Sequence, residues 1–286
     1  MRPGYRHHHL THRIRMKTFL TVVVLAGLAV GCQKVPLTNR SQLKLVSNDQ
    51  LLPLSAQNYK EVLDTSRVIR TGADAEMIQR VGNRLKTAME SYLNANNYGD
   101  RIKGFQWEFN LIQSPQVNAW CMPGGKVAFY TGILPYTQNE AGVAAVMGHE
   151  ISHALADHSA ERMSESLLAN GLIQGGQIVT GTAASRSSNQ VSAILLQSVG
   201  AALPYGYQFG RALPHSRKQE SEADNLGLIF MAMAGYNPQE AINFWGRMAQ
   251  AGGNKPPEFL STHPSDARRI ADLKKLLPEA MKYYKR

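Results

Sequence analysis

Apolar and polar positions follow two different periods along the chain, and each period predicts a kind of element. From residue 73 to 93, apolar residues recur every three or four positions, which predicts an amphipathic helix. The same spacing returns from Glu140, where Asn139 can cap the helix N-terminus. It appears again over 216–234, within "GYNPQEAINFWGRMAQ" and after "STHPSDARR". Most of the chain is therefore expected to be helical.

The other period lies between the first two of these helices. Aromatic and β-branched residues alternate there with polar ones, which predicts a strand at 105–112 and a hairpin with arms near 116–121 and 126–131. Residues 167–210 are rich in Gly, Ala, Ser and Gln, which indicates a helical pair or a mobile cover near the site. We expect an α+β fold with a small sheet and an edge hairpin beside the helix that begins at Glu140.

The beginning of the chain has the features of an export signal. Basic residues precede the apolar run "FLTVVVLAGLAV", which is too short for a permanent membrane span and ends in "LAVGC". We expect residues 1–31 to be a signal peptide with a lipobox, or alternatively an ordinary cleaved signal, with Met1 or Met16 as the start. Cys32 would then carry the lipid, residues 32–58 would form a polar tether, and residues 59–286 would form a single domain.

The formal net charge of +10 is partly due to this leader. From Cys32 onward, 26 basic residues face 21 acidic ones, a balance of +5. Without an obvious basic run, this charge gives no reason to expect a nucleic-acid partner. If Cys32 is acylated, Cys121 has no partner for a disulfide, so the fold must depend on its hydrophobic core.

The sequence "GHEISHALADH" contains the most specific chemical signal. His149 and His153 lie four apart on the predicted helix, so both can offer a nitrogen to one zinc ion. Glu150 follows the first histidine and can act as the general base toward an attacking water. His158 lies about 500° round the helix from His153, so we expect it to be solvated or in a surface contact.

A third ligand is expected from another helix. Glu220 and Asp224 are four apart on the predicted 216–234 helix and can face the two histidines together. Glu220 would bind the metal, and Asp224 would accept a hydrogen bond from the outer nitrogen of one ligand histidine. Glu222 lies on another side of the helix and is a minor alternative.

The combination of H-E-x-x-H with S-R-x-x-E-x-x-A-D, here Ser216 to Asp224, resembles a known family. It is similar to the gluzincin metallopeptidases that include HtpX, the CAAX prenyl proteases, BepA and LoiP, and the export signal favours a lipoprotein member. The resemblance implies a zincin-like fold and one Zn²⁺ per chain, with Glu220 as the ligand. It also implies that Asn118 and Ala119, in "NAW", bind an extended substrate.

A further pair follows from the same resemblance. The arrangement H-P-x-x-x-x-R matches His263 and Arg269, and the histidine would approach the metal or stabilise the oxyanion. As a fourth zinc ligand, His263 would close the open position and hold the enzyme latent. Alternatively, His263-Pro264 simply breaks the chain before the last helix, with Ser265 as its N-cap.

These observations favour a lipid-anchored, periplasm-facing zinc metalloendopeptidase of the outer membrane. Its expected substrates are unfolded or misassembled envelope proteins. One alternative is a chaperone-like assembly lipoprotein with a latent or structural zinc site, and another is an exopeptidase for small peptides. The sequence leaves the natural substrate and the oligomeric state open.

Overall fold

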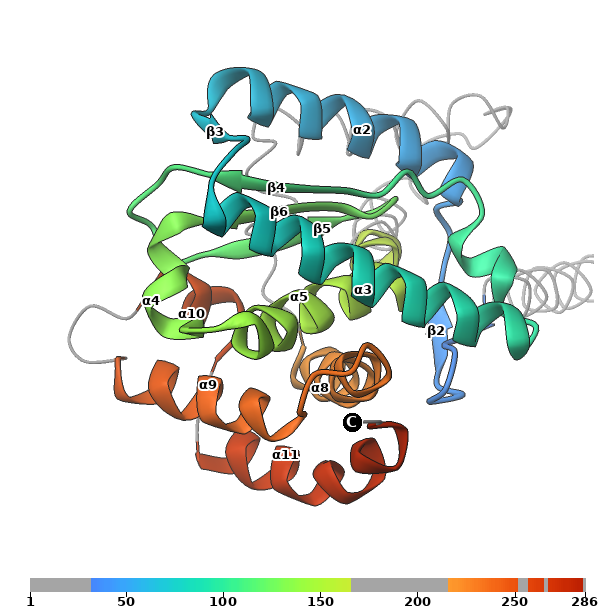
Figure 1. Cartoon of the computed structure of the whole chain (residues 1–286). Helices are drawn as coiled ribbons and strands as arrows, with labels where there is room; N and C mark the ends of the chain where they lie inside the picture. Colours follow the sequence, from blue (N-terminus) through green and yellow to red (C-terminus); the bar gives the residue numbers. More distant parts are fainter. Residues whose placement is uncertain (1–31, 166–215, 252–256, 265–266, 285–286) are drawn as a thin grey trace, which may run out of the picture.

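The computed structural model describes residues 32–165, 216–251, 257–264 and 267–284 (Figure 1). The helices in these ranges include α2 (Asn48–Thr65), α3 (Ala73–Ala95), α4 (Leu134–Thr137), α5 (Glu140–Leu155), α8 (Arg217–Met233), α9 (Gln239–Gln250), α10 (Glu258–Thr262) and α11 (Ala267–Ala280). Residues 158–165 are helical as well. The strands are β1 (Cys32–Lys34), β2 (Ser41–Leu43), β3 (Val68–Ile69), β4 (Glu108–Ile112), β5 (Ala119–Met122) and β6 (Lys126–Tyr130). The short 3-10 helices are η1 (Gly99–Ile102), η2 (Thr131–Ile133) and η3 (Met281–Tyr283). The expected mostly helical α+β fold is confirmed.

The main sheet has the strand order β3-β4-β6-β5. β4 runs parallel to β6, and the other neighbouring strands are antiparallel. β5 and β6 form the expected hairpin, with Ala119 opposite Phe129, and β5 lies at the edge. Gly124 and Gly125 form its turn with φ values of 87° and 78°, which glycine adopts without a Cβ clash.

Helices cover both faces of this sheet. In Figure 1, α2 lies above the sheet, α3 and α5 lie below it, and α8, α9 and α11 form the lower layer. Phe129 of β6 belongs to the main core, whereas its neighbour Tyr130 packs with Tyr59 and Val62 of α2. Because β6 is buried on both faces, its residues 127–130 form a continuous apolar run rather than an alternating one. The sheet thus forms a rigid support behind α5.

Residues 32–58 differ from the polar tether that their sequence suggests. They form β1, β2 and the first half of α2, and Val35, Val46 and Leu51 are buried. Val46 and Leu51 pack with Ala160, far along the chain. The apolar residues of this segment are few and show no helical or strand periodicity, so the sequence does not reveal that they pack against residues far along the chain. The segment is nevertheless part of the folded domain.

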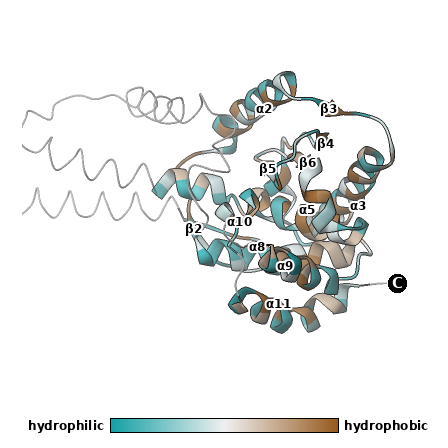
Figure 2. Ribbon diagram, turned by 90° about the vertical axis from the view of Figure 1, so that its left-hand side faces the viewer, coloured by the Kyte–Doolittle hydropathy of each residue, from teal (hydrophilic) through white to brown (hydrophobic). Residues whose placement is uncertain are grey.

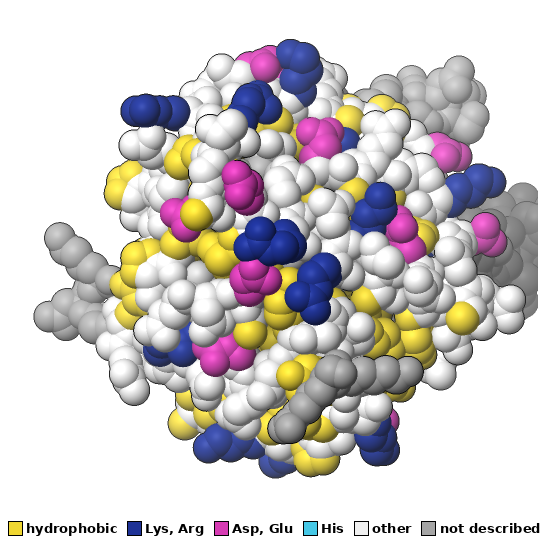
Figure 3. All heavy atoms as spheres, in the orientation of Figure 1, with side chains coloured by type: hydrophobic (Ala, Val, Ile, Leu, Met, Phe, Trp, Pro, Cys, Tyr) yellow, Lys and Arg dark blue, Asp and Glu magenta, His cyan; other side chains and the backbone are white. Residues whose placement is uncertain are grey.

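The outer surface is mixed in polarity and charge. Figure 2 shows hydrophilic and hydrophobic residues side by side along α9 and α11, as expected for helices with one exposed face. On the face shown in Figure 3, Lys and Arg are interspersed with Asp and Glu. Among the described helices, none is both long and apolar enough to span a bilayer. The predicted signal peptide, the segment 167–210 and the Ser265 cap lie outside the described residues.

Candidate metal centre

The centre is built where α5 and α8 cross at two glycines. A Cβ added to Gly227 of α8 would lie 2.9 Å from the backbone nitrogen of His149, and one added to Gly148 would lie 3.1 Å from the carbonyl oxygen of Gly227. Side chains at these positions would hold the helices apart. The close approach brings Glu220, two turns before Gly227, opposite His149.

Each helix is fixed at its start by its own side chains. Asn139 caps α5 by accepting a hydrogen bond from the backbone N–H of Gly142, as the sequence predicts. Ser216 caps α8 in the same way by accepting a hydrogen bond from the N–H of Gln219, and the side-chain oxygen of Gln219 accepts one from the backbone N–H of Ser216. Both ligand-bearing helices therefore begin at defined positions.

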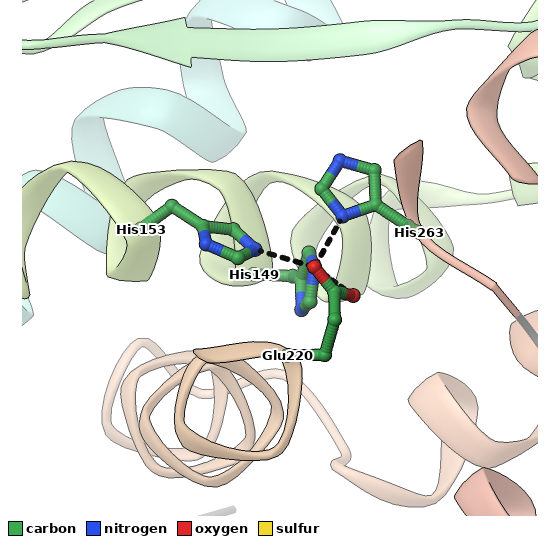
Figure 4. Close-up of side chains that lie close together, drawn as sticks. All are labelled: His149, His153, Glu220 and His263. Atoms are coloured by element: carbon green, nitrogen blue, oxygen red, sulfur yellow. Dashed lines mark hydrogen bonds and ion pairs between the residues drawn. The ribbon is translucent and has the colours of Figure 1, made fainter. Parts of the chain in front are cut away.

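Four side chains meet at the crossing, and Figure 4 shows them pointing toward one another. Nε2 of His149 lies 3.0 Å from Nε2 of His153 and 3.2 Å from Nδ1 of His263. Oε1 of Glu220 lies 3.4 Å from Nε2 of His153 and 3.0 Å from Nδ1 of His263. A tetrahedron of nitrogen and oxygen ligands around zinc has edges of about 3.3 Å, so the four donors match such a site.

Burial and charge within the cluster also fit a cation. All four side chains are buried, although three of them are histidines and one is a carboxylate. Oε1 of Glu150 is buried as well and accepts no hydrogen bond from the described residues, although Nε2 of His263 lies 3.3 Å away. Such a group normally requires a partner, which a water or an ion at the cluster would supply. The residues present therefore fit a zinc ion.

Glu150 lies beside this cluster, 3.3 Å from Nε2 of His263. Burial raises the pKa of Glu150, which makes its carboxylate a better proton acceptor. His263 thus has two neighbours: its Nδ1 faces the ligands and its Nε2 faces the base. The geometry brings His149, His153 and Glu220 together with Glu150 beside them. It also places His263 at the cluster, where the H-P-x-x-x-x-R resemblance leads us to expect it.

Asp224 and Arg269 form the layer behind His149. Oδ1 of Asp224 lies 3.0 Å from Nδ1 of His149, which is the outer contact that the sequence predicts. Arg269 donates to both oxygens of Asp224, at 2.7 and 2.8 Å, and its Nη1 lies 2.9 Å from Oε2 of Glu220. Its guanidinium also stacks over Trp245, 3.4 Å from the ring centroid. Arg269 therefore links the carboxylates of Asp224 and Glu220.

The surroundings shift the pKa values of the two ligand histidines of α5 in opposite directions. Burial lowers the pKa of His149, but hydrogen bonds with Asp224 and Glu220 outweigh it and raise the pKa to about 9. Burial dominates at His153 and lowers its pKa well below the usual range. For Glu220, burial is outweighed by His263 and Arg269, so its pKa is well below the ordinary value. The carboxylate of Glu220 is thus ionised and can serve as a metal ligand.

The prediction for His158 is wrong. Its side chain is fully buried, its Nδ1 lies 2.8 Å from Nδ1 of His153, and its Nε2 lies 3.0 Å from Oε2 of Glu222. The helical wheel fails because α5 ends at Leu155 and Asp157 has a φ of 54°, so the chain turns before His158. Glu222 is directed to His158 and not to the ligand cluster, in agreement with its minor rank as a ligand.

Asn118 and Ala119 lie at the start of the edge strand β5. The carbonyl of Asn118 accepts a hydrogen bond from the N–H of Tyr130, and its side-chain oxygen accepts one from the N–H of Ala119. The neighbouring carbonyl of Val117 accepts a hydrogen bond from Phe259 of α10, the helix that leads into His263. Their role in substrate binding stays a prediction.

Sequence reasoning missed the residues that support the centre from outside, chiefly Trp245 and Arg40. Trp245 contacts His149 edge-on, with ring centroids 5.6 Å apart, and Arg40 binds Glu222 and Glu161. Glu161, three positions after His158, is an acidic residue close to the motif that needs a partner when buried. No local sequence pattern, however, connects Arg40 to Glu161 or Glu222.

Comparisons with known proteins agree with this geometry. Residues 79–277 match the model of peptidase family M48. The chain is 32% identical to the mitochondrial metalloendopeptidase OMA1 of Saccharomyces cerevisiae, over 99% of this chain and 84% of that protein. It is 31% identical to the human metalloendopeptidase OMA1 and 28% identical to the beta-barrel assembly-enhancing protease of Yersinia pestis, in each case over 86% of this chain.

The coverage differs among these relatives. The chain spans 46% of the human protein and 48% of the Yersinia protein, about half of each. The match nevertheless includes both helices of the metal centre, because 79–277 contains the H-E-x-x-H motif, Glu220 and His263. Family model, relatives and ligand geometry thus agree: the chain belongs to peptidase family M48 and is a metalloendopeptidase, a hydrolase.

Proposed function

We propose that this protein is a lipid-anchored zinc metalloendopeptidase that hydrolyses internal peptide bonds in unfolded or misassembled envelope proteins. The single observation that carries the chemistry is the convergence of His149, His153 and Glu220 with Glu150 beside them. Zinc bound by the three ligands would act as a Lewis acid and lower the pKa of a water molecule to about 7.

The chain's own residues would perform the remaining steps. Glu150 accepts the proton from the attacking water and passes it to the leaving amine. Asp224 holds His149 through its Nδ1, so that Nε2 is directed to the ligand cluster. An extended substrate would add to the edge of β5 beside Asn118 and Ala119, which supports a preference for unfolded segments.

The envelope assignment has two supports. The lipobox-like "LAVGC" predicts acylation at Cys32, and one relative is a beta-barrel assembly-enhancing protease. Gln33 follows the cysteine in place of an aspartate that would favour inner-membrane retention, so we propose the outer membrane with the protein facing the periplasm. The OMA1 relatives are mitochondrial, so the proposed envelope location depends on the predicted signal and on the beta-barrel assembly-enhancing protease alone.

His263 supports a second candidate, a latent form of the same site. Its Nδ1 lies within 3.0–3.2 Å of two other donors of the cluster, and its Nε2 lies 3.3 Å from Glu150. In this position His263 would occupy the place of a water and also engage the base. A chaperone-like assembly protein with a latent metal would have this arrangement permanently, whereas an enzyme would release His263 during turnover.

The substitution Glu150→Gln separates these candidates. We expect zinc content to be retained and cleavage of casein to fall by at least about 100-fold, because the general base is lost. Mass spectrometry of the products of the unaltered enzyme should show internal cuts, whereas products shortened only from the ends would indicate an exopeptidase. Full biological rescue by the Glu150→Gln variant would favour the chaperone-like protein.

A further inference from the structure

A line of buried polar groups leads from the metal centre to the segment that directly follows Cys32. His153, a ligand, contacts His158 at 2.8 Å between the two Nδ1 atoms. His158 contacts Glu222 at 3.0 Å, and Glu222 accepts a hydrogen bond from Nε of Arg40 at 2.7 Å. Arg40 precedes β2, whose partner strand β1 begins at Cys32.

The direction of donation along this line is fixed by its outer end. Both oxygens of Glu222 accept hydrogen bonds there, Oε1 from the hydroxyl of Thr38 and Oε2 from Nε of Arg40, so the carboxylate acts as the acceptor toward His158 as well. Nε2 of His158 must therefore carry the proton that is donated to Glu222, which leaves Nδ1 of His158 as an acceptor. Nδ1 of His153 then donates to it, and the lone pair of His153 Nε2 is directed to the ligand cluster.

The two ligand histidines of α5 are thus oriented by different means. His149 has a carboxylate, Asp224, directly on its Nδ1 at 3.0 Å. On its Nδ1 side, His153 is connected to the carboxylate of Glu222 through the intervening ring of His158. A relay of this kind transmits orientation only while its outer carboxylate is held in place.

Arg40 is the group that holds this carboxylate. Besides Glu222, it binds both oxygens of Glu161, at 2.5 and 2.8 Å, and Glu161 also accepts a hydrogen bond from Gln219 of α8. Thr38, from the same turn between β1 and β2, donates to Glu222 as well. The arginine side chain is 11% exposed, so its removal would leave two glutamates in a partly dehydrated setting without their cationic partner, which is costly.

We propose that Arg40 and His158 are positioning residues for the metal ligand His153, and that they couple the N-terminal β1–β2 hairpin to the metal centre. This inference rests on the proposed zinc site. The segment after the predicted lipid attachment point would then help to position a metal ligand. Displacement of the β1–β2 hairpin would release Glu222 and His158 and lower the affinity for the metal.

The test measures zinc affinity, with the full chain, by competition with a chromophoric chelator. Arg40→Met keeps the length and apolar stem of the side chain but removes its hydrogen bonds. We expect zinc binding to weaken by about 10–100-fold, the range typical for losing an outer partner of a metal ligand. The absorption spectrum of the Co²⁺-loaded protein should change too, because the orientation of His153 changes.

A matched control is Arg247→Met, since Arg247 is also partly buried and binds a glutamate, Glu240, at 2.7 Å. Its Nε donates to the carbonyl of Tyr136, so Arg247 supports a part of the fold other than the line from Glu222 to the metal centre. It should lower the melting temperature without changing the zinc dissociation constant. Equal effects of both substitutions on zinc affinity, or an unchanged affinity with Arg40→Met, would overturn the inference and leave Arg40 with a purely stabilising role.

A second pair of variants keeps the inference testable if Arg40→Met does not fold. His158→Gln retains a donor and an acceptor, whereas His158→Phe retains a planar ring but neither. Zinc affinity closer to the original in the Gln variant supports the relay, and equal affinities in both variants overturn it. If the unaltered chain binds no zinc, the proposed function itself fails; zinc binding that is indifferent to Arg40 and His158 refutes the relay alone.

Discussion

The crossing of α5 and α8 offers a sharp test, because one methyl group there should disturb the metal centre more than the fold. Gly227→Ala would place a Cβ 2.9 Å from the backbone nitrogen of His149 and 3.1 Å from its Cα. Ordinary contacts of this kind begin at 3.4 Å, so the helices would have to separate by about 0.5 Å. Neither neighbour is a flexible side chain that can move aside.

Two energies oppose each other in this variant. Overpacking costs about 1–3 kcal/mol, whereas replacing a helical glycine by alanine stabilises by about 1 kcal/mol, so the net loss should be roughly 0–2 kcal/mol. The metal centre is less tolerant, because ligands must be held within about 0.5 Å of their productive geometry. His149 moves with α5 while Glu220 moves with α8, so zinc affinity should fall on the order of 10-fold or more.

Calorimetry in the presence of EDTA and chelator competition for zinc measure the two effects separately. Gly246→Ala in α9 is the control, since a Cβ there meets nothing within 4 Å. It should stabilise the fold by about 1 kcal/mol and leave zinc affinity unchanged. If Gly227→Ala binds zinc as tightly as the unaltered chain and melts at the same temperature, the close helix approach does not set the ligand geometry.

Three further outcomes follow from the site. Asp224→Asn should lower zinc affinity by about 10–100-fold in chelator competition, and unchanged affinity would show that this outer contact is dispensable. His263→Ala should raise casein cleavage per bound zinc; a loss of about 100-fold would identify an oxyanion donor instead. Burial raises the pKa values of Glu161 and Glu222, but hydrogen bonds from Arg40, His158 and their neighbours lower them below ordinary. Their stabilisation is therefore present above about pH 4.3 and lost as the pH falls further, so Arg40→Met should unfold at a higher pH in a circular-dichroism titration with EDTA, and an identical midpoint would refute this pairing.

The sequence by itself determined the local elements and the core of the site. Helical spacing predicted α3, α5, α8 and α9, and alternation predicted the β5–β6 hairpin, because burial of one face imposes a period on the residues that provide it. The spacing within the motifs also predicted that His149 and His153 share a face, as do Glu220 and Asp224. All of these are relations between residues a few positions apart.

Only the tertiary structure decided how distant segments meet. The left-handed turn at Asp157 redirects His158 into the interior, and no hydrophobic period signals such a turn. Arg40 and the apolar residues of 32–58 find partners more than a hundred positions away, so their packing has no local signature. His263 is placed between the ligands and Glu150 by the docking of α10, a contact between surfaces that exist only once the helices have assembled.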